Sequence, residues 1–577
     1  MNQSLSSPNS ATVTLQQLMD ANDSNSRLLK RQLAAMIDAR TQKGSVAEIP
    51  FQEFRLDSRQ VASGDVFVLL NSHTPNYQKS RDYLLQAAKD AAFILSEIDP
   101  VTLLSTDLLS TDDASPRAVS ASAAQQQLDA LSCPVLYVPH IRDTLGSLIQ
   151  AHLQYQHPVT LPKVAAVTGT NGKTTISQLV AQLTQLTGMS SAVMGTAGNG
   201  RLGALVQASH TTGDALAVQQ FLHQMGTENA ELLALEASSH GLDQQRLQGM
   251  PVSVAIYTNL SRDHLDYHAD MAEYAAAKAR LFDKAYFPAL THAVINIDDE
   301  HAQVMLDTAH ASDLVVWTYS LDASKPATFV AADITPSLEG VKIGLRTSFS
   351  STEAGGEPAE VEACERQPDG TDSDVMHIIS PLLGRFNVAN LLAAIAAVVA
   401  LGVSREKIAD AVPKLIGAVG RMQRVPSANG CFIVDYAHTP DALSQVLASL
   451  KTHCEGKLWA VFGCGGDRDA GKRPLMAQAG LAGADKVILT ADNPRTEDPE
   501  AILQDMQVGM SAEQYARTHI DPERQAAIEY AVNQAEPDDI VVIAGKGHET
   551  YQEINNVRYD FDDSVVLQQA LEQAGRV

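Results

Sequence analysis

The clearest chemical signal in this sequence is a glycine-containing loop, GTNGKTT, at residues 169–175. It follows the apolar run VAAVT and precedes a stretch of helical periodicity that starts near Ile176. A turn of this kind between a strand and a helix directs backbone N–H groups at phosphate oxygens. Lys173 is placed to reach the terminal phosphates, and Thr174 to offer its hydroxyl to Mg²⁺. The loop therefore predicts a nucleotide-triphosphate site.

The spacing of this loop narrows the kind of enzyme. Gly169 lies only three residues before Gly172, which is shorter than the G-x-x-x-x-G-K-[ST] pattern of the common phosphate loop. The shortened form points away from ordinary GTPases and motor ATPases.

Two further polar motifs, EASSH (236–240) and TNLSRDHLDYH (258–268), each follow an apolar run. Glu236 offers a hard oxygen ligand for Mg²⁺. His264 is a second candidate ligand, although histidine on Mg²⁺ is unusual. Lys278 lies in the helical stretch EYAAAKARLF, where a lysine taken alone is typical of a solvent-exposed face.

The last third of the chain contains four polar motifs, and each follows an apolar run: DYAHTPDAL (435–443), GCGGDRDAGKRP (463–474), DNPRTEDP (492–499) and GKGHE (545–549). Arginine forks suit carboxylates and phosphates. The motifs place five chemically active side chains at one edge of one predicted sheet: Arg468, Arg495, Lys546, His548 and Glu549.

The elements that must position these motifs are buried strands. Continuous apolar runs separated by helical patterns predict parallel α/β sheets. In open α/β sheets ligands bind outside the carboxyl ends of the strands, which is where the polar motifs lie. The predicted strands are 164–168, 232–236, 252–260, 293–297, 431–436, 458–463, 486–492 and 540–547.

Length and composition limit the possible functions. A chain of 577 residues is long enough for three or four domains. The formal net charge of -26 argues against a nucleic-acid partner, which would need clustered Lys and Arg. Five cysteines without a CxxC pair are expected to be small buried hydrophobes.

Other segments bear on location and surface. The N-terminal MNQSLSSPNS lacks the basic and apolar regions of a signal peptide. The longest apolar stretch, 390–403, is shorter than the roughly 20 residues of a membrane span and predicts a buried helix. These features favour a cytoplasmic protein without a membrane span. Residues 103–130 and 348–374 are poor in large apolar side chains and predict flexible surface loops.

Taken together, the motifs resemble those of the Mur ligase family, from about residue 50 to about residue 565 apart from the two insertions. They are GTNGKTT, EASSHGLDQQR, TNLSRDHLDYH, AAKARLF, GRFNVAN, GRMQRV, DYAHTPDAL, GCGGDRDAGKRPLM, DNPR and GKGHE. The DNPR form is similar to that of the members that add meso-2,6-diaminopimelate to UDP-N-acetylmuramoyl-L-alanyl-D-glutamate, here called the UDP-muramyl dipeptide.

This resemblance implies an α/β fold of three domains. They are an N-terminal UDP-binding α/β domain (1–159), a central P-loop-type ATPase domain with a parallel sheet (160–420) and a C-terminal Rossmann-like, amino-acid-binding domain (421–577). It also implies an ATP- and Mg²⁺-dependent ligase, acting as a monomer in peptidoglycan synthesis. The substrate carboxylate would take the γ-phosphate of ATP as an acyl phosphate, from which the amine of the amino acid displaces phosphate.

The resemblance also assigns residues. The implied catalytic residues are Lys173, Glu236, His264 and Lys278. The implied Mg²⁺ ligands are Thr174, Glu236, His264 and Lys278, the last modified to a carbamate. The implied ATP contacts are Gly169, Thr170, Asn171, Gly172, Lys173, Thr174, Thr175, Asn387, Asn390 and Arg421. The implied UDP-muramyl-dipeptide contacts are Leu56, Ser58, Thr211, Thr212, Ser238, Gln244 and Arg246. The implied diaminopimelate contacts are Arg468, Asp492, Asn493, Pro494, Arg495, Gly545 and Glu549.

Two positions depart from the family pattern. His210 stands where the family often has Asn before the two threonines, and residues 71–78 match its second uridine-binding loop only loosely.

Arg495 is expected to decide the choice of amino acid. With L-lysine bound, a buried Arg495 would lack the distal carboxylate. A site left with such an unpaired group rejects the wrong substrate by about 10⁴–10⁵.

Three other functions compete with this interpretation. Folylpolyglutamate synthase shares the type of reaction and the loop of residues 169–175, here called the ATP loop. It does not account for DNPR or for LDSR at 56–59. A P-loop kinase or motor ATPase does not fit the shortened loop. A non-catalytic relative would not need to keep all four of Lys173, Glu236, His264 and Lys278.

Overall fold

The computed structural model describes residues 12–20, 40–41, 44–72, 76–105, 120–207, 210–337, 340–348 and 375–577. The chain divides into two compact units. Unit 1 comprises Met1–Pro162, Gly213–Ala230 and Gly241–Pro251, and unit 2 comprises Lys163–Thr212, Glu231–His240 and Val252–Val577. Two segments from the middle of the sequence therefore belong to unit 1.

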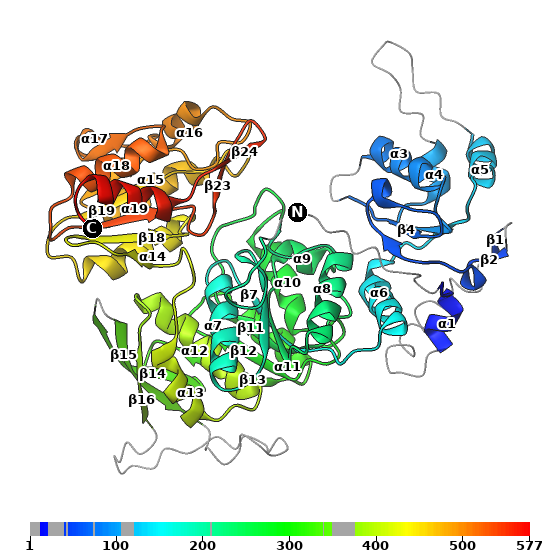
Figure 1. Cartoon of the computed structure of the whole chain (residues 1–577), viewed down its shortest axis with the longest axis horizontal. Coiled ribbons are helices and arrows are strands. Elements are labelled where there is room, and N and C mark those ends of the chain that lie inside the picture. The colour runs from blue at the N-terminus through cyan, green and yellow to red at the C-terminus, as the bar shows by residue number, and fades with distance from the viewer. Residues whose placement is uncertain are drawn as a thin grey trace. The chain divides into compact units, whose positions relative to one another are not determined.

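Unit 1 is built on a parallel four-stranded sheet in the order β3-β4-β5-β6. Strand β4 and helices α3, α4 and α5 of this unit are labelled in Figure 1. Its strands are β3 (Phe54–Arg55), β4 (Val66–Leu69), β5 (Phe93–Ser96) and β6 (Val135–Tyr137). Its helices are α1 (Leu15–Asp20), α3 (Tyr77–Ala87), α4 (Pro100–Ser105), α5 (Ala121–Asp129), α6 (Arg142–Gln156) and α8 (Ala215–Thr227). Short elements are β1 (Arg40–Thr41), β2 (Gly44–Ser45), η1 (Val46–Glu48) and η2 (Ser58–Gln60). Both faces of the sheet are covered, as a parallel sheet requires.

The first predicted loop, 103–130, is partly wrong. Its two ends are helical, in α4 and α5. Leu103, Leu104 and Ala124 are fully buried in the core of unit 1, so a few apolar side chains at helical spacing are enough to anchor both helices. Residues 106–119 lie outside the described residues.

Unit 2 contains a ten-stranded sheet in the order β16-β15-β14-β13-β12-β11-β7-β10-β8-β9. The strands from β14 to β8 in this order run parallel, and β9, β15 and β16 are antiparallel to their neighbours. The first five strands are β7 (Lys163–Thr168), β8 (Ser191–Gly195), β9 (Gly198–Gly200), β10 (Leu232–Glu236) and β11 (Val252–Tyr257). The others are β12 (His292–Asn296), β13 (Val315–Ser320), β14 (Phe329–Ser337), β15 (Gly340–Thr347) and β16 (Val375–Ser380).

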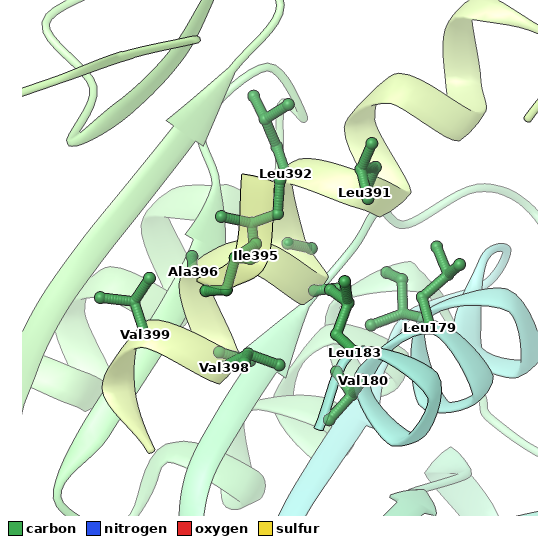
Figure 2. Close-up of a cluster of buried hydrophobic side chains, with 14 of the residues drawn as sticks. Leu179, Val180, Leu183, Leu391, Leu392, Ile395, Ala396, Val398 and Val399 are labelled. Carbon is green, nitrogen blue, oxygen red and sulfur yellow. The ribbon is translucent and has the colours of Figure 1, made fainter. Parts of the chain in front are cut away.

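Helices α7 (Lys173–Leu186) and α12 (Arg385–Ala400) pack together against this sheet (Figure 2). Leu179 and Leu183 of α7 face Leu391 and Ile395 of α12, and all four are buried. The apolar stretch predicted as a buried helix is therefore α12. Other helices are α9 (Ser239–Asp243), α10 (Met271–Ala279), η3 (Arg280–Phe282), α11 (Ala302–Ala311), α13 (Arg405–Ala411) and η4 (Val412–Lys414).

A second sheet of unit 2 has six strands in the order β17-β18-β22-β19-β20-β21, all parallel except β17. They are β17 (Gln423–Val425), β18 (Cys431–Asp435), β19 (Leu458–Phe462), β20 (Lys486–Leu489), β21 (Thr518–Ile520) and β22 (Ile540–Ala544). A hairpin, β23 (Tyr551–Ile554) and β24 (Val557–Asp560), follows β22. The helices are α14 (Pro440–Lys451), α15 (Lys472–Gly483), α16 (Pro499–Met506), α17 (Ala512–Ala516), α18 (Arg524–Gln534) and α19 (Asp563–Gln573).

The predicted α/β class with parallel sheets is confirmed, and all eight predicted strands are present. Three strands end three residues earlier than predicted: β11 ends at Tyr257, β20 at Leu489 and β22 at Ala544, so TNLS, DNPR and GKGHE are loops. Within the second predicted loop, residues 349–374 lie outside the described part of the chain. They connect β15 and β16, which are paired antiparallel neighbours. Across the described ranges, no helix is long and apolar enough to span a membrane.

Candidate active site

The loop between β7 and α7 depends on two glycines. Gly169 and Gly172 have φ values of +150° and +89°, in the region that favours glycine. A Cβ on Gly169 would lie 1.8 Å from Thr258 Oγ1, and one on Gly172 would lie 2.6 Å from Asn390 Oδ1. Other residues therefore cannot replace them without displacing the loop.

A neighbouring loop after β11 clamps the ATP loop. The backbone N–H of Asn171 donates to Asn259 Oδ1 (2.9 Å), and that of Thr170 donates to Asn259 O (2.8 Å). Thr258 Oγ1 donates to Asn171 O (2.6 Å). Sequence reasoning did not single out Thr258 or Asn259, although both lie in TNLS at the end of the predicted strand 252–260. They hold the loop in one conformation.

Two lysines meet at the start of the loop. Lys173 Nζ donates to Gly169 O (2.9 Å) and Thr170 O (2.8 Å), and Lys278 Nζ donates to Gly169 O (2.8 Å). Lys278 is buried, and its ammonium lies 4.5 Å from the centre of the Tyr274 ring. Burial lowers the pKa of Lys278 well below its usual range, and the nearby charge of Lys173 lowers it further. The expectation that Lys278 taken alone faces solvent is therefore wrong.

Glu236 ends β10 inside a network of hydroxyl groups. Its carboxylate accepts from Thr196 N (2.9 Å) and Thr196 Oγ1 (3.1 Å). Thr196 Oγ1 also lies within hydrogen-bond distance of Thr211 Oγ1 (3.0 Å), and Thr212 Oγ1 donates to Glu236 O (2.9 Å). Ser238 Oγ donates to Thr212 Oγ1 (3.0 Å). The structure thus brings three predicted dipeptide contacts beside one predicted metal ligand.

His264 lies on the loop after β11 with a φ of +56°. Burial lowers its pKa to about 3, so its imidazole is neutral near pH 7 and able to bind a cation. Asp263 is adjacent, with its Oδ2 3.6 Å from His264 Nε2. The set Glu236, His264 and Thr174 offers a carboxylate, a neutral imidazole and a hydroxyl.

Protein side chains alone do not complete a metal site here. Over the described ranges, three or more His, Cys, Asp or Glu residues do not gather in a way that would hold an ion. The donor set fits a hard cation that takes most of its ligands from phosphates and water, as Mg²⁺ does.

The predicted nucleotide-side residues lie around the same loop. Asn390 Nδ2 donates to Asn387 Oδ1 (3.0 Å), and Asn390 packs against Gly172. Arg421 Nη2 donates to Thr174 Oγ1 (3.2 Å), and its guanidinium lies 4.3 Å from the centre of the Tyr436 ring. Thr175 is buried in the first turn of α7.

The loops after β20 and β22 bring the carboxylates of Asp492 and Glu549 together beside Asn493. Asn493 Nδ2 donates to Glu549 Oε2 (2.8 Å), and both Asp492 and Asn493 are buried. A Cβ on Gly545 would lie 2.8 Å from Asp492 Oδ2, so glycine is needed for the two loops to approach. The hairpin β23–β24 is attached to the loop after β20, because Glu553 N donates to Asn493 Oδ1 (2.9 Å).

Arg495 is not left without partners, which corrects the expectation above. It has a φ of +53°, and Arg495 Nη1 donates to Gly466 O (2.6 Å). Arg495 Nε lies 3.9 Å from Glu553 Oε2, and the side chain is 23% exposed. Glu553, on the hairpin, was not apparent from the motifs. It supplies a negative charge whether or not a substrate carboxylate is present.

Arg468 lies on the loop after β19 and is more exposed. Its Nη1 is 3.9 Å from Asp266 Oδ2, and its side chain is 58% exposed. The loop itself is fixed against DNPR, because a Cβ on Gly466 would lie 2.0 Å from Pro494 O. The Arg468 guanidinium therefore lies largely in solvent on a loop whose backbone is held by DNPR.

Unit 1 carries the remaining predicted residues. Ser58 Oγ donates to Gln86 Oε1 (3.1 Å), and Leu56 packs against the core. Arg246 Nη2 donates to Gln244 Oε1 (2.8 Å). Arg142 Nη1 donates to Gln244 O (3.2 Å).

Comparison with known proteins identifies the family. Residues 167–398 match the Mur ligase middle domain, and residues 420–547 match the Mur ligase, glutamate ligase domain. A UDP-N-acetylmuramoyl-L-alanyl-D-glutamate--2,6-diaminopimelate ligase from Vibrio vulnificus is 38% identical over 532 residues, 91% of this chain and 95% of that protein. The chain belongs to the Mur ligase family. A protein of the same name from Pseudomonas aeruginosa is 40% identical to this Mur ligase over 526 residues, 91% of this chain and 96% of that protein.

Solved structures agree with this assignment. A structure of a UDP-N-acetylmuramoyl-L-alanyl-D-glutamate--2,6-diaminopimelate ligase is 41% identical, with a TM-score of 0.63, and covers 98% of this chain and 100% of that one. Folylpolyglutamate synthase from Mycobacterium tuberculosis is 19% identical with a TM-score of 0.54, over 70% of this chain and 92% of that one, which shows a shared fold alone. The sequence-based prediction of an ATP-dependent ligase is confirmed by membership of the Mur ligases.

Proposed function

We propose that this Mur ligase adds meso-2,6-diaminopimelate to UDP-N-acetylmuramoyl-L-alanyl-D-glutamate, in the cytoplasm and in peptidoglycan synthesis. The observation that carries the proposal is the group of charged side chains on and beside DNPR and GKGHE, here called the amino-acid pocket. It combines two carboxylates, Asp492 and Glu549, with the guanidinium groups of Arg495 and Arg468. Such a pocket suits a substrate that carries both ammonium and carboxylate groups. The names of the relatives support this substrate.

Three parts of the chain would divide the work. Residues 1–159 would hold the UDP end of the muramyl dipeptide through Leu56 and Ser58. Residues 160–420 would hold ATP, and residues 421–577 the amino acid. Arg421 bonds Thr174 of the ATP loop and stacks on Tyr436. A movement at Arg421 would therefore reach the loop directly.

The ATP subsite fits phosphoryl transfer. Backbone N–H groups of residues 169–175 and the ammonium of Lys173 would hold the β- and γ-phosphates. Thr174, Glu236, His264 and a carbamate on Lys278 would hold Mg²⁺, which when bound neutralises charge on the phosphates. Lys278 fits carbamylation because its pKa is lowered, which leaves more of the neutral amine that reacts with CO₂.

The hydroxyl network would orient the dipeptide carboxylate. Thr211, Thr212 and Ser238 lie within hydrogen-bond reach of one another or of Thr196, beside Glu236. A carboxylate held there would lie close to the γ-phosphate. Closure of the site would exclude water from the acyl phosphate, which water would otherwise hydrolyse.

The test is phosphate release from ATP by the purified full chain. We expect release only when ATP, Mg²⁺, the UDP-muramyl dipeptide and diaminopimelate are all present, with the chain sedimenting as a monomer. Fast release with a folate substrate, and none with the muramyl dipeptide, would overturn the proposal.

A further inference from the structure

Lys546, in the GKGHE loop, is fully buried, which is rare for a lysine. It lies between two glycines with φ values of +116° for Gly545 and +55° for Gly547. A Cβ on Gly547 would lie 2.6 Å from Tyr436 Cβ. The loop is therefore pressed against its neighbours on both sides of Lys546, and the ammonium is directed inward.

The ammonium of Lys546 lies among the polar groups of the proposed amino-acid pocket. Nζ donates to Asn493 Oδ1 (3.0 Å) and lies 3.5 Å from Glu549 Oε2 and 3.7 Å from Asp492 Oδ1. Asn493 in turn donates to Glu549. One cation thus joins all three polar residues, and its single charge faces two carboxylates.

We propose that Lys546 is a positioning residue for the amino-acid substrate: an internal counter-ion that holds Asp492, Asn493 and Glu549 ready to accept a substrate ammonium. The inference rests on the proposed function, because it assumes that this pocket takes the amino acid. Lys546 itself has no exposed surface and acts through the other three.

The electrostatics of the pocket explain why a cation is needed. Two nearby buried carboxylates do not both stay ionised without one. Burial and the charge of Asp492 already raise the pKa of Glu549. Burial acts to raise the pKa of Asp492 as well, but Lys546 and Arg524 lower it overall. Without Lys546, Glu549 would take up a proton and donate toward the substrate ammonium instead of accepting from it.

A second buried cation supports the same pocket from behind. Arg524, in α18, is fully buried and paired with Asp563 (2.7 Å). It donates to Ala491 O (3.3 Å) and Ala544 O (3.0 Å), the residues just before Asp492 and Gly545. Because Arg524 fixes the backbone ends of both loops, Lys546 is left to fix their side chains.

The test is Lys546→Met, which keeps the length of the side chain and removes its charge. We expect the KM for diaminopimelate to rise by about 30-fold or more, since breaking a buried charge pair is costly. The KM values for ATP and the UDP-muramyl dipeptide should stay within about twofold, because their subsites are elsewhere. Lys457→Met is the matched control. Lys457 lies 3.4 Å from Glu536 but is 49% exposed, so Lys457→Met should leave the KM values of all three substrates unchanged.

A double-mutant cycle separates positioning from a loss of structure. Glu549→Gln removes one negative charge. The factor by which it raises the KM for diaminopimelate should therefore be at least about fivefold smaller in the Lys546→Met background than in wild type. Additive effects, an unchanged KM for diaminopimelate, or an equal rise in the KM for ATP would each overturn the inference.

One measurement does not depend on a variant that folds. An amine-reactive reagent applied to the native wild-type chain, followed by mass spectrometry, should label Lys457 well before Lys546. Equal rates would overturn the inference. If wild type uses diaminopimelate but Lys546→Met behaves like wild type, only this inference fails. If wild type uses no amino acid with the muramyl dipeptide, the proposed function fails.

Discussion

Replacing Arg495 by alanine tests how the pocket distinguishes diaminopimelate from L-lysine. The two amino acids differ by the distal carboxylate, which Arg495 is proposed to bind. In the absence of that carboxylate Arg495 still donates to Gly466 O and lies 3.9 Å from Glu553. Lysine therefore does not leave a buried arginine without a partner, and the full cost of an unpaired charge does not apply.

The expected preference follows from what the distal carboxylate adds. Two charge-assisted hydrogen bonds contribute about 3–4 kcal/mol together, after the exchange with Glu553. At about 1.4 kcal/mol per tenfold, this corresponds to roughly 10²–10³ in kcat/KM. This is smaller than the 10⁴–10⁵ typical of a site left with an unpaired group.

The assay is phosphate release with each amino acid at saturating ATP and muramyl dipeptide. Arg495→Ala should lower kcat/KM for diaminopimelate by about 10²–10³ and change that for lysine by less than about fivefold, which removes the preference. Arg558→Ala is the matched control. Arg558 lies at the same 3.9 Å from Glu553, but it is 54% exposed on β24. Its replacement should therefore change kcat/KM for either amino acid little.

Two results would refute this reasoning. Wild-type enzyme that uses lysine as well as diaminopimelate would remove the role of Arg495, although the ligase activity would stand. A wild-type preference of about 10⁴ or more would mean that Glu553 does not compensate Arg495, as in a site with a truly unpaired group.

Three further predictions concern other parts of the chain. Lys278→Ala should lose most activity and regain part of it when a small carboxylic acid is added. Lys284→Ala, which changes an exposed lysine nearby, should retain activity. Electron density for an unmodified Lys278 in the active enzyme would contradict this prediction. Replacing 348–374 with a short Gly/Ser linker should leave activity within about threefold, because the paired strands β15 and β16 already bring its ends together; a large loss with the fold intact would assign the segment a function. Burial lowers the pKa of His152 to about 4, so protonation of His152 opposes folding. The free energy of unfolding of unit 1 should therefore fall by about 3 kcal/mol as the pH falls from about 6.5 to about 4. Amide exchange in β4 and β5 should report this loss, and His152→Phe should reduce it; identical profiles would refute the linkage.

The sequence predicts the sheets well because burial on both faces leaves a simple pattern. β7, β10, β18 and β22 each contain an unbroken apolar run of four or five residues, and helices cover both of their faces. The segment from 103 to 130 has no such continuous pattern. Its helices need only Leu103, Leu104 and Ala124 in the core, and the polar residues around them dominate the composition.

The candidate site is predictable only in part, for a physical reason. The motifs locate the loops, because polar residues after buried strands meet at one sheet edge. They do not reveal partners brought close by the fold. Glu553 reaches Arg495 from the hairpin, and Asn259 reaches the ATP loop from the loop after β11. Contacts of this kind join segments whose spacing in sequence carries no regular signal.

The two subsites solve opposite electrostatic problems in a chain whose net charge is -26. At the ATP loop, Lys173 and Lys278 meet at one backbone carbonyl, so the arrangement favours anions: phosphates, and a carbamate in place of one ammonium. In the amino-acid pocket, Lys546 offsets only one of two carboxylates, so the arrangement favours an added ammonium. Distant acidic side chains are screened by salt beyond roughly 10 Å, whereas these buried groups are not. The local pairing of buried charges, rather than the overall charge, therefore determines which substrate each subsite accepts.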